Sequence, residues 1–172
     1  MRFPRAKVLA AASAFIFLIA QAWHAGGQSD PVAQPIPYSH KIHIALGLAC
    51  QQCHPNPDPG AAMTIPAVAK CMECHTTIAR EKPAIERLVE FSKNEQPIPW
   101  MRVYTVPSWV LWNHRRHLKA GMTCVQCHGD VAQMDVMVEA TNVTKMAGCL
   151  DCHRAKHTSL RCNSCHDLGP GN

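Results

Sequence analysis

The stretch Cys50-Gln-Gln-Cys53-His54 carries a pattern, Cys-x-x-Cys-His, that returns four more times along this 172-residue chain. The other four stretches read Cys71-Met-Glu-Cys74-His75, Cys124-Val-Gln-Cys127-His128, Cys149-Leu-Asp-Cys152-His153 and Cys162-Asn-Ser-Cys165-His166. We number them sites 1 to 5 in chain order. All ten cysteines of the chain lie in these five sites, so none is left for another purpose.

Cys-x-x-Cys-His is the attachment sequence of c-type haem. Its two thiols add to the two vinyl groups of one porphyrin, and the adjacent histidine ligates the iron from the same side. Five repeats therefore predict five covalently bound haem c groups. The predicted proximal iron ligands are His54, His75, His128, His153 and His166.

Three other uses of paired cysteines explain the sequence less well. A zinc ribbon combines two Cys-x-x-Cys units in each four-cysteine site, and five units do not pair off. Disulfides suit an exported chain with an even number of cysteines, but they give no reason for a histidine after each pair. A thioredoxin-like redox pair is single and lies in a βαβ context that this sequence lacks.

The remaining histidines match the number of sixth ligands that five irons need. Of eleven histidines, five belong to the sites and His24 lies beside the N-terminal apolar run. The other five, predicted as distal iron ligands, are His40, His43, His114, His117 and His157. The first four form two H-x-x-H pairs, each seven residues before a site, and positions i and i+3 share one face of a helix.

His157 belongs to no repeated pattern, and Met63 or Met146 is the alternative donor for one iron. A thioether ligand raises the potential of its haem, whereas two imidazoles at every iron predict low-spin centres without an open position. We therefore predict no catalytic residues, and an electron carrier rather than an enzyme.

Much of the chain is an internal duplication. Residues 37–54 match residues 111–128 at an offset of 74, including both H-x-x-H pairs, Gly47 with Gly121, and sites 1 and 3. Sites 2 and 4 correspond at an offset of 78, and site 5 has no counterpart. We predict a first, dihaem half at residues 26–95 and a second, trihaem half at residues 96–172.

The N-terminus has the features of an export segment. Arg2, Arg5 and Lys7 precede an uncharged run from Val8 to Ala20. We predict that residues 1–25 are either a signal peptide, cleaved after Ala22, or a retained membrane anchor. Both place the rest of the chain outside the cytoplasm. Without the three leader charges the formal net charge falls from +5 to +2, and ten haem propionates remove the electrostatic case for nucleic-acid binding.

The rest of the sequence predicts a mainly irregular fold with short α-helices, little or no β-sheet and a core made of haem. One amphipathic helix is expected at residues 81–93, with Pro83 near its start. Residues 96–100 break it, and residues 101–112 are expected to be extended. Trp100, Trp109 and Trp112 are expected to pack on porphyrin faces, as Tyr38 is beside His40.

The segments Tyr-Ser-His-Lys-Ile-His before Cys50 and Trp-Asn-His-Arg-Arg-His before Cys124 resemble the paired-histidine signature of class III multihaem cytochromes, the c3 and c7 type, over residues 35–166. The resemblance implies that the first histidine of a pair serves the following site and the second a neighbouring site. On this basis His40 and His43 serve sites 1 and 2, His114 and His117 serve sites 3 and 4, and His157 is left for site 5.

The stretch from Pro97 to His114, together with five sites and an apolar N-terminus, resembles more narrowly the pentahaem subunit of alternative complex III. This implies a relay subunit in a quinol-oxidising respiratory complex on the periplasmic face of the cytoplasmic membrane, beside iron–sulfur or haem partners. One alternative is a soluble periplasmic electron shuttle. The other is a multihaem oxyanion reductase, which needs an open iron position that the histidine inventory does not leave.

Overall fold

The computed structural model describes residues 31–168. The segment predicted as signal peptide or anchor, residues 1–25, lies outside them. Within the described residues no helix has the length and apolar character needed to cross a membrane.

Short helices separated by irregular backbone make up the described chain. They are α2 (His40–Ala45), α3 (Cys50–Cys53), α4 (Val68–His75), α5 (Pro83–Lys93), α6 (His114–Lys119), α7 (Cys124–His128), the 3₁₀ turn η1 (Val131–Gln133), α8 (Met146–Ala155) and α9 (Cys162–Cys165). Between residues 31 and 168 the β structure is a single isolated bridge, Val110 to His166. This confirms the predicted fold class.

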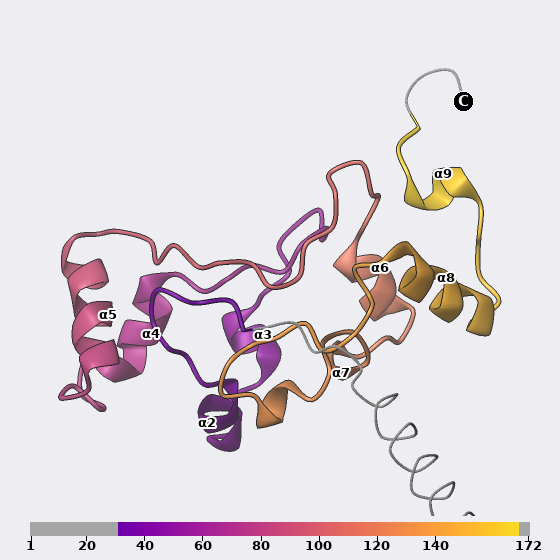
Figure 1. Cartoon of the computed structure of the whole chain (residues 1–172). Coiled ribbons are helices and arrows are strands. Elements are labelled where there is room, and N and C mark those ends of the chain that lie inside the picture. Colours follow the sequence, from indigo (N-terminus) through magenta and orange to yellow (C-terminus); the bar gives the residue numbers. More distant parts are fainter. Residues whose placement is uncertain (1–30, 169–172) are drawn as a thin grey trace, which may run out of the picture.

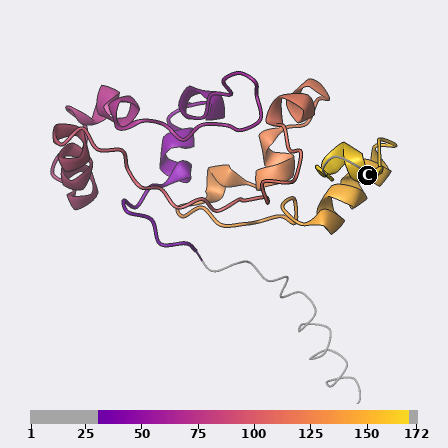
Figure 2. The ribbon, with the colours of Figure 1, turned by 90° about the horizontal axis from the view of Figure 1, so that it is seen from above.

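The molecule is elongated. In Figure 1, α5 and α4 lie at one end, α3 and α7 near the middle, and α8 and α9 at the other end. The view from above keeps the same succession (Figure 2). The site-bearing helices are therefore strung along the length of the molecule.

The duplicated sequence builds duplicated local structure. Ser39 and Asn113 cap α2 and α6 with their side-chain oxygens, each accepting a hydrogen bond from the backbone three residues on. Gln52 and Gln126 accept hydrogen bonds from the backbone N–H groups that precede α3 and α7. The helix starts that position the H-x-x-H pairs and the sites are thus fixed by matching residues in both halves.

The apolar core is small. Ile36, Leu88 and Ile98 form a buried cluster against α4 and α5, and Val138 is the other buried apolar side chain among the described residues. No side chain in the described range is less than 2% exposed. The helix predicted at residues 81–93 is confirmed as α5, which begins two residues later because Lys82 is its N-cap and Pro83 its first residue.

The loop that follows site 1 packs against α6 of the second half. Arg115 donates a backbone hydrogen bond to the Gly60 carbonyl (3.0 Å), and its guanidinium pairs with Asp58 and contacts the Asn56 carbonyl (3.1 Å). Gly60 is buried with a φ of 89°, and a Cβ there would lie 2.5 Å from Arg115 Nε and 2.6 Å from its Cβ. This close approach requires glycine.

Preventing haem attachment is expected to leave the chain unfolded, because so few apolar side chains are buried that they do not offset the entropy of ordering the backbone. The measurement is far-UV circular dichroism and protease resistance of chain made without cytochrome c maturation, beside the matured protein. Cooperative unfolding of the haem-free chain would contradict this.

Gly60→Ala is expected to destabilise the holoprotein by roughly 1–3 kcal/mol more than Gly47→Ala. The two glycines have similar φ values, 89° and 85°, but a Cβ at Gly47 meets nothing within 4 Å. The backbone strain is therefore matched, and the difference reports the contact with Arg115. Denaturant unfolding of both variants measures it, and equal losses would count against a tight junction there.

Candidate haem sites

Four site histidines face the four histidines of the H-x-x-H pairs. The ring centres are 6.3 Å apart for His40 and His54, 6.2 Å for His43 and His75, 6.5 Å for His114 and His128, and 6.2 Å for His117 and His153. Two imidazoles on opposite sides of one metal ion, each bonded at about 2 Å, have ring centres roughly 6.4 Å apart. The spacing fits one iron between each pair.

Backbone carbonyls orient six of these rings. The Nδ1 atoms lie 2.7–3.0 Å from carbonyl oxygens, in the pairs His43 with Ser39, His54 with Thr64, His75 with Ile78, His114 with Ala61, His117 with Asn113 and His153 with Ser159. At His114 the indole N–H of Trp112 also donates to Nδ1 (3.0 Å), so the carbonyl does not set the tautomer of that ring. At the other five rings the carbonyl only accepts, so Nδ1 carries the proton and Nε2 keeps its lone pair for a metal.

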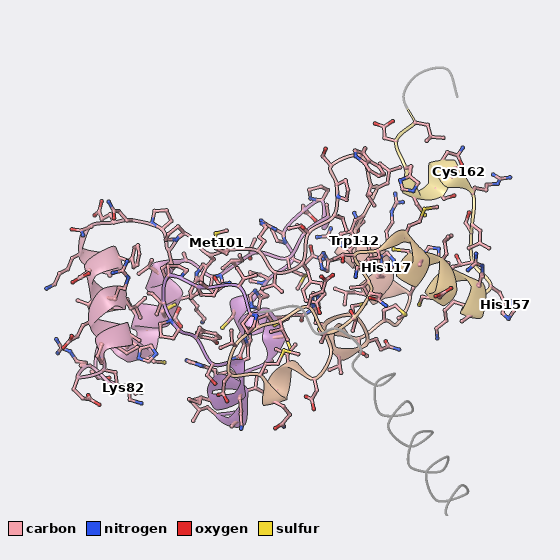
Figure 3. All side chains as sticks on the ribbon, in the orientation of Figure 1. Lys82, Met101, Trp112, His117, His157 and Cys162 are labelled. Atoms are coloured by element: carbon pink, nitrogen blue, oxygen red, sulfur yellow. The ribbon has the colours of Figure 1, made fainter. Side chains whose placement is uncertain are left out.

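One further aromatic ring in each half contacts both histidines of its H-x-x-H pair. Tyr38 stacks on His43 at 4.4 Å and meets His40 edge-on at 4.9 Å. Trp112, at the equivalent position, stacks on His117 at 4.1 Å and meets His114 edge-on at 5.1 Å. Figure 3 labels Trp112 and His117 side by side. These contacts restrict the rotation of the imidazole planes.

Burial keeps two of the facing imidazoles neutral. It lowers the pKa of His40 to about 4, with the neighbouring His54 and His43 lowering it further. Burial also lowers the pKa of His128, assisted by His114 and His54. A neutral imidazole is the form that binds metal.

The cysteines of each site lie on one helical turn, as thioether attachment to one porphyrin requires, and cysteines of different sites are neighbours. Burial raises the pKa of Cys71, and the thiol of Cys53 raises it further. Burial likewise raises the pKa of Cys124, and the thiol of Cys50 raises it further. Between residues 31 and 168 no three Cys, His or acidic side chains gather into a metal site of their own.

Site 5 differs from the other four. Among the described residues, the aromatic ring in contact with His166 is that of Trp109, with ring centres 5.2 Å apart. The Nδ1 atom of His166 is buried and has no hydrogen-bond partner there. The structure does not bring His157 against His166. Figure 3 places His157 at the C-terminal end of α8, where the chain leaves the helix toward Cys162.

The backbone gives His157 a structural role. It follows the C-cap of α8 with a φ of 50°, and its N–H and that of Thr158 bond back to the carbonyls of Arg154 and His153. At the offset of 78 its counterpart is Ala79, which has a φ of 56°. Met146, one turn before Cys149 on α8, is 61% exposed.

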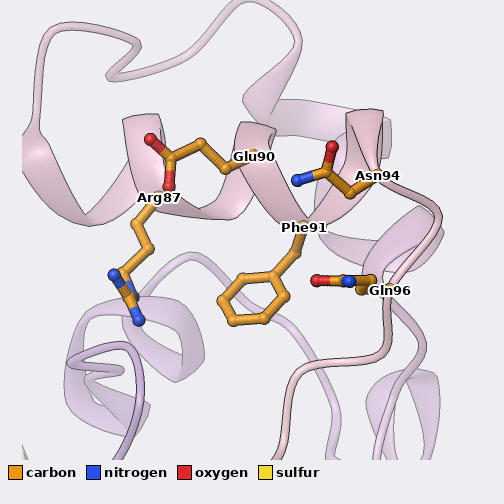
Figure 4. Close-up of a pocket in the computed structure, with 5 residues that line it drawn as sticks. All are labelled: Arg87, Glu90, Phe91, Asn94 and Gln96. Atoms are coloured by element: carbon orange, nitrogen blue, oxygen red, sulfur yellow. The ribbon is translucent and has the colours of Figure 1, made fainter.

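Of the tryptophans expected on porphyrin faces, Trp112 lies on His117 and Trp109 beside His166, while Trp100 packs against the buried cluster near Tyr38. A pocket on α5 and the turn after it is lined by Arg87, Glu90, Phe91, Asn94 and Gln96 (Figure 4). No site residue lines it, so it is not part of the haem sites.

Comparison with protein families matches the two halves separately. The class III cytochrome C family matches residues 19–98, and the family of cytochrome c7 and related cytochrome c matches residues 110–167. The chain is a multihaem cytochrome c of the class III, c3/c7 type. Two class III domains lie in tandem in this cytochrome, and it carries multiple covalent haem c groups and transfers electrons.

Among curated proteins, the cytochrome resembles the multihaem cytochrome c subunit of menaquinone reductase from Nitratidesulfovibrio vulgaris, with 35% identity over 97 residues. The match covers 55% of this cytochrome and 45% of that protein, so the chain spans less than half of its relative. The relative is named for a menaquinone reductase and not for alternative complex III.

The carbonyl partners of the imidazoles were not found by sequence reasoning. Ser39 and Asn113 stand four residues before the second histidine of each pair, so that helical spacing was a usable signal for two of them. Thr64 and Ala61 act through backbone atoms of irregular loops, which no residue type specifies.

Replacing His117 by Ala is expected to remove the sixth ligand opposite His153 and convert one haem from low-spin to high-spin. Electron paramagnetic resonance of the oxidised holoprotein measures the change. Arg116→Ala on the same helix is the matched control, because the Arg116 side chain is exposed, whereas His117 faces His153. An unchanged low-spin signal in His117→Ala would contradict the pairing.

Proposed function

We propose that this cytochrome is an electron-relay subunit of a membrane-bound, quinone-linked respiratory complex. The observation that carries the proposal is the set of four imidazole pairs, each at 6.2–6.5 Å, strung along an elongated chain. Such an arrangement serves to pass electrons along the molecule. A carrier with two imidazoles at each iron has no position for a substrate.

Five haem c groups are proposed, one for each site. Haem iron supplies the one-electron chemistry, while the chain sets spacing, ligands and surroundings. The proposed distal ligands of sites 1, 2, 3 and 4 are, in that order, His40, His43, His114 and His117. His157 as the distal ligand of site 5 stays a prediction, and Met63 or Met146 stays the alternative. The halves at residues 26–95 and 96–172 are proposed as the two domains.

The quinone link is supported by the menaquinone reductase subunit that the cytochrome resembles, and by the sequence resemblance to a quinol-oxidising complex. A menaquinone reductase and a quinol-oxidising complex pass electrons in opposite directions, but both exchange electrons with the quinone pool. The proposed partners are iron–sulfur or haem subunits and a quinone-binding membrane subunit. The proposed location is the periplasmic face of the cytoplasmic membrane, since class III cytochromes are periplasmic.

The experiment is to extract the cytochrome gently from native membranes and follow its haem absorption while a menaquinol analogue is added. We expect other subunits to co-purify, and the haem to become reduced in a way that a quinone-site inhibitor blocks. The His117→Ala form should keep its partners but transfer electrons more slowly, and Arg116→Ala should behave as wild type. Recovery as a free protein that does not respond to quinol would overturn the proposal.

A further inference from the structure

We propose that the two halves of this cytochrome pack about an internal pseudo-two-fold axis that passes between sites 1 and 3. The five haem sites then form one unbranched row in the order 2, 1, 3, 4, 5. The inference rests on the proposed relay function for its purpose, but its geometry comes from hydrogen bonds between the halves.

Two backbone hydrogen bonds between the halves are images of each other. Arg115 N–H donates to the Gly60 carbonyl at 3.0 Å, and Lys41 N–H donates to the Met134 carbonyl at 3.0 Å. At the duplication offset of 74, Lys41 corresponds to Arg115 and Gly60 to Met134. Each half therefore gives its paired-histidine helix to the other half's loop, an exchange that a two-fold axis produces.

Neighbouring contacts follow the same exchange. His114 N–H donates to the Ala61 carbonyl at 3.1 Å, and Ser39 donates through its hydroxyl to Asp135 at 2.7 Å. Ala61 and Asp135 are equivalent at the offset of 74. The symmetry is imperfect where the sequence departs from the repeat, because Asp58, which pairs with Arg115, corresponds to Ala132.

A two-fold axis also brings each residue beside it next to its own equivalent. The helices α3 and α7, which carry the equivalent cysteines Cys50 and Cys124, lie together near the middle of the molecule in Figure 1. The loop that follows site 1 supplies the Thr64 carbonyl to His54 of site 1 (2.7 Å) and the Ala61 carbonyl to the backbone N–H of His114, the facing histidine of site 3 (3.1 Å). Sites 1 and 3 therefore meet at the junction of the halves.

The remaining neighbours extend the row in both directions. In the first half α2 supplies histidines to sites 1 and 2, so these sites are neighbours. In the second half α6 supplies histidines to sites 3 and 4 in the same way. In Figures 1 and 2 the helices α4, α3, α7, α8 and α9 follow one another in this order.

The order of the sites makes the two ends of the row different. Sites 2, 1, 3 and 4 are related by the axis and make a row with equivalent ends. Site 5 lies outside the duplication and extends one end alone. Electrons therefore join and leave the row at site 2, beside α4 and α5, and at site 5, beside α9.

Ligand replacement in the full-length holoprotein tests the order. His114→Met gives site 3 a thioether ligand and raises its reduction potential, so it is already reduced when its neighbours titrate. A reduced neighbour makes reduction harder, and this Coulomb effect falls with distance. In redox titrations followed by NMR, we expect sites 1 and 4 to shift to lower apparent potential, with much smaller shifts at sites 2 and 5. His43→Met at site 2 should shift site 1 above all others.

A shift at site 4 without one at site 1 in His114→Met would overturn the order, and so would a largest shift anywhere but site 1 in His43→Met. If His114→Met does not retain its haem, nuclear Overhauser contacts in the wild-type protein decide instead. Contacts between the haem substituents of sites 1 and 3 are expected, and their absence overturns the junction. Failure to exchange electrons with quinone would tell against the proposed function and leave the order of the sites standing.

Discussion

An iron held between two imidazoles from opposite sides requires two histidines whose ring centres are roughly 6.4 Å apart. This chain meets the requirement four times, with ring centres 6.2–6.5 Å apart. Each time one of the two histidines lies in, or directly after, a helix of four to ten residues that carries the attachment cysteines. Helices this short are unstable alone. Their capping residues and the loop carbonyls therefore serve to hold the imidazoles in place. The apolar core is small and stabilises the chain little.

Duplication explains how one chain arranges several such centres. The H-x-x-H helix carries the ligands of two sites, so it sets two sites side by side in each half, and Tyr38 or Trp112 packs across both ligands. The crossed hydrogen bonds of Lys41 and Arg115 then join the halves through sites 1 and 3. An elongated molecule results, because each half contributes its first site to the junction and directs its second site away from it (Figure 1).

Sequence reasoning went furthest where residue type and chemistry coincide. The cysteine spacing, the paired histidines, the helix at Pro83–Lys93 and the scarcity of β structure all followed from the residues. The junction did not, because Gly60, Ala61 and Met134 contribute backbone carbonyls, which any residue supplies. Counting ligands leaves His157 for site 5, which stays a prediction, but a second reason for a histidine at this position is also present. A histidine also tolerates the left-handed backbone after a helix, the conformation that Ala79 adopts at the equivalent position.

The most direct test is the crystal structure of the native holoprotein with the irons located by their anomalous scattering. The account predicts five irons in one unbranched row, with the first four lying between His40 and His54, His43 and His75, His114 and His128, and His117 and His153. The irons of sites 1 and 3 should be neighbours at the centre of the row. Fewer than five irons, exchanged imidazole partners, or sites 1 and 3 separated by another iron would contradict it.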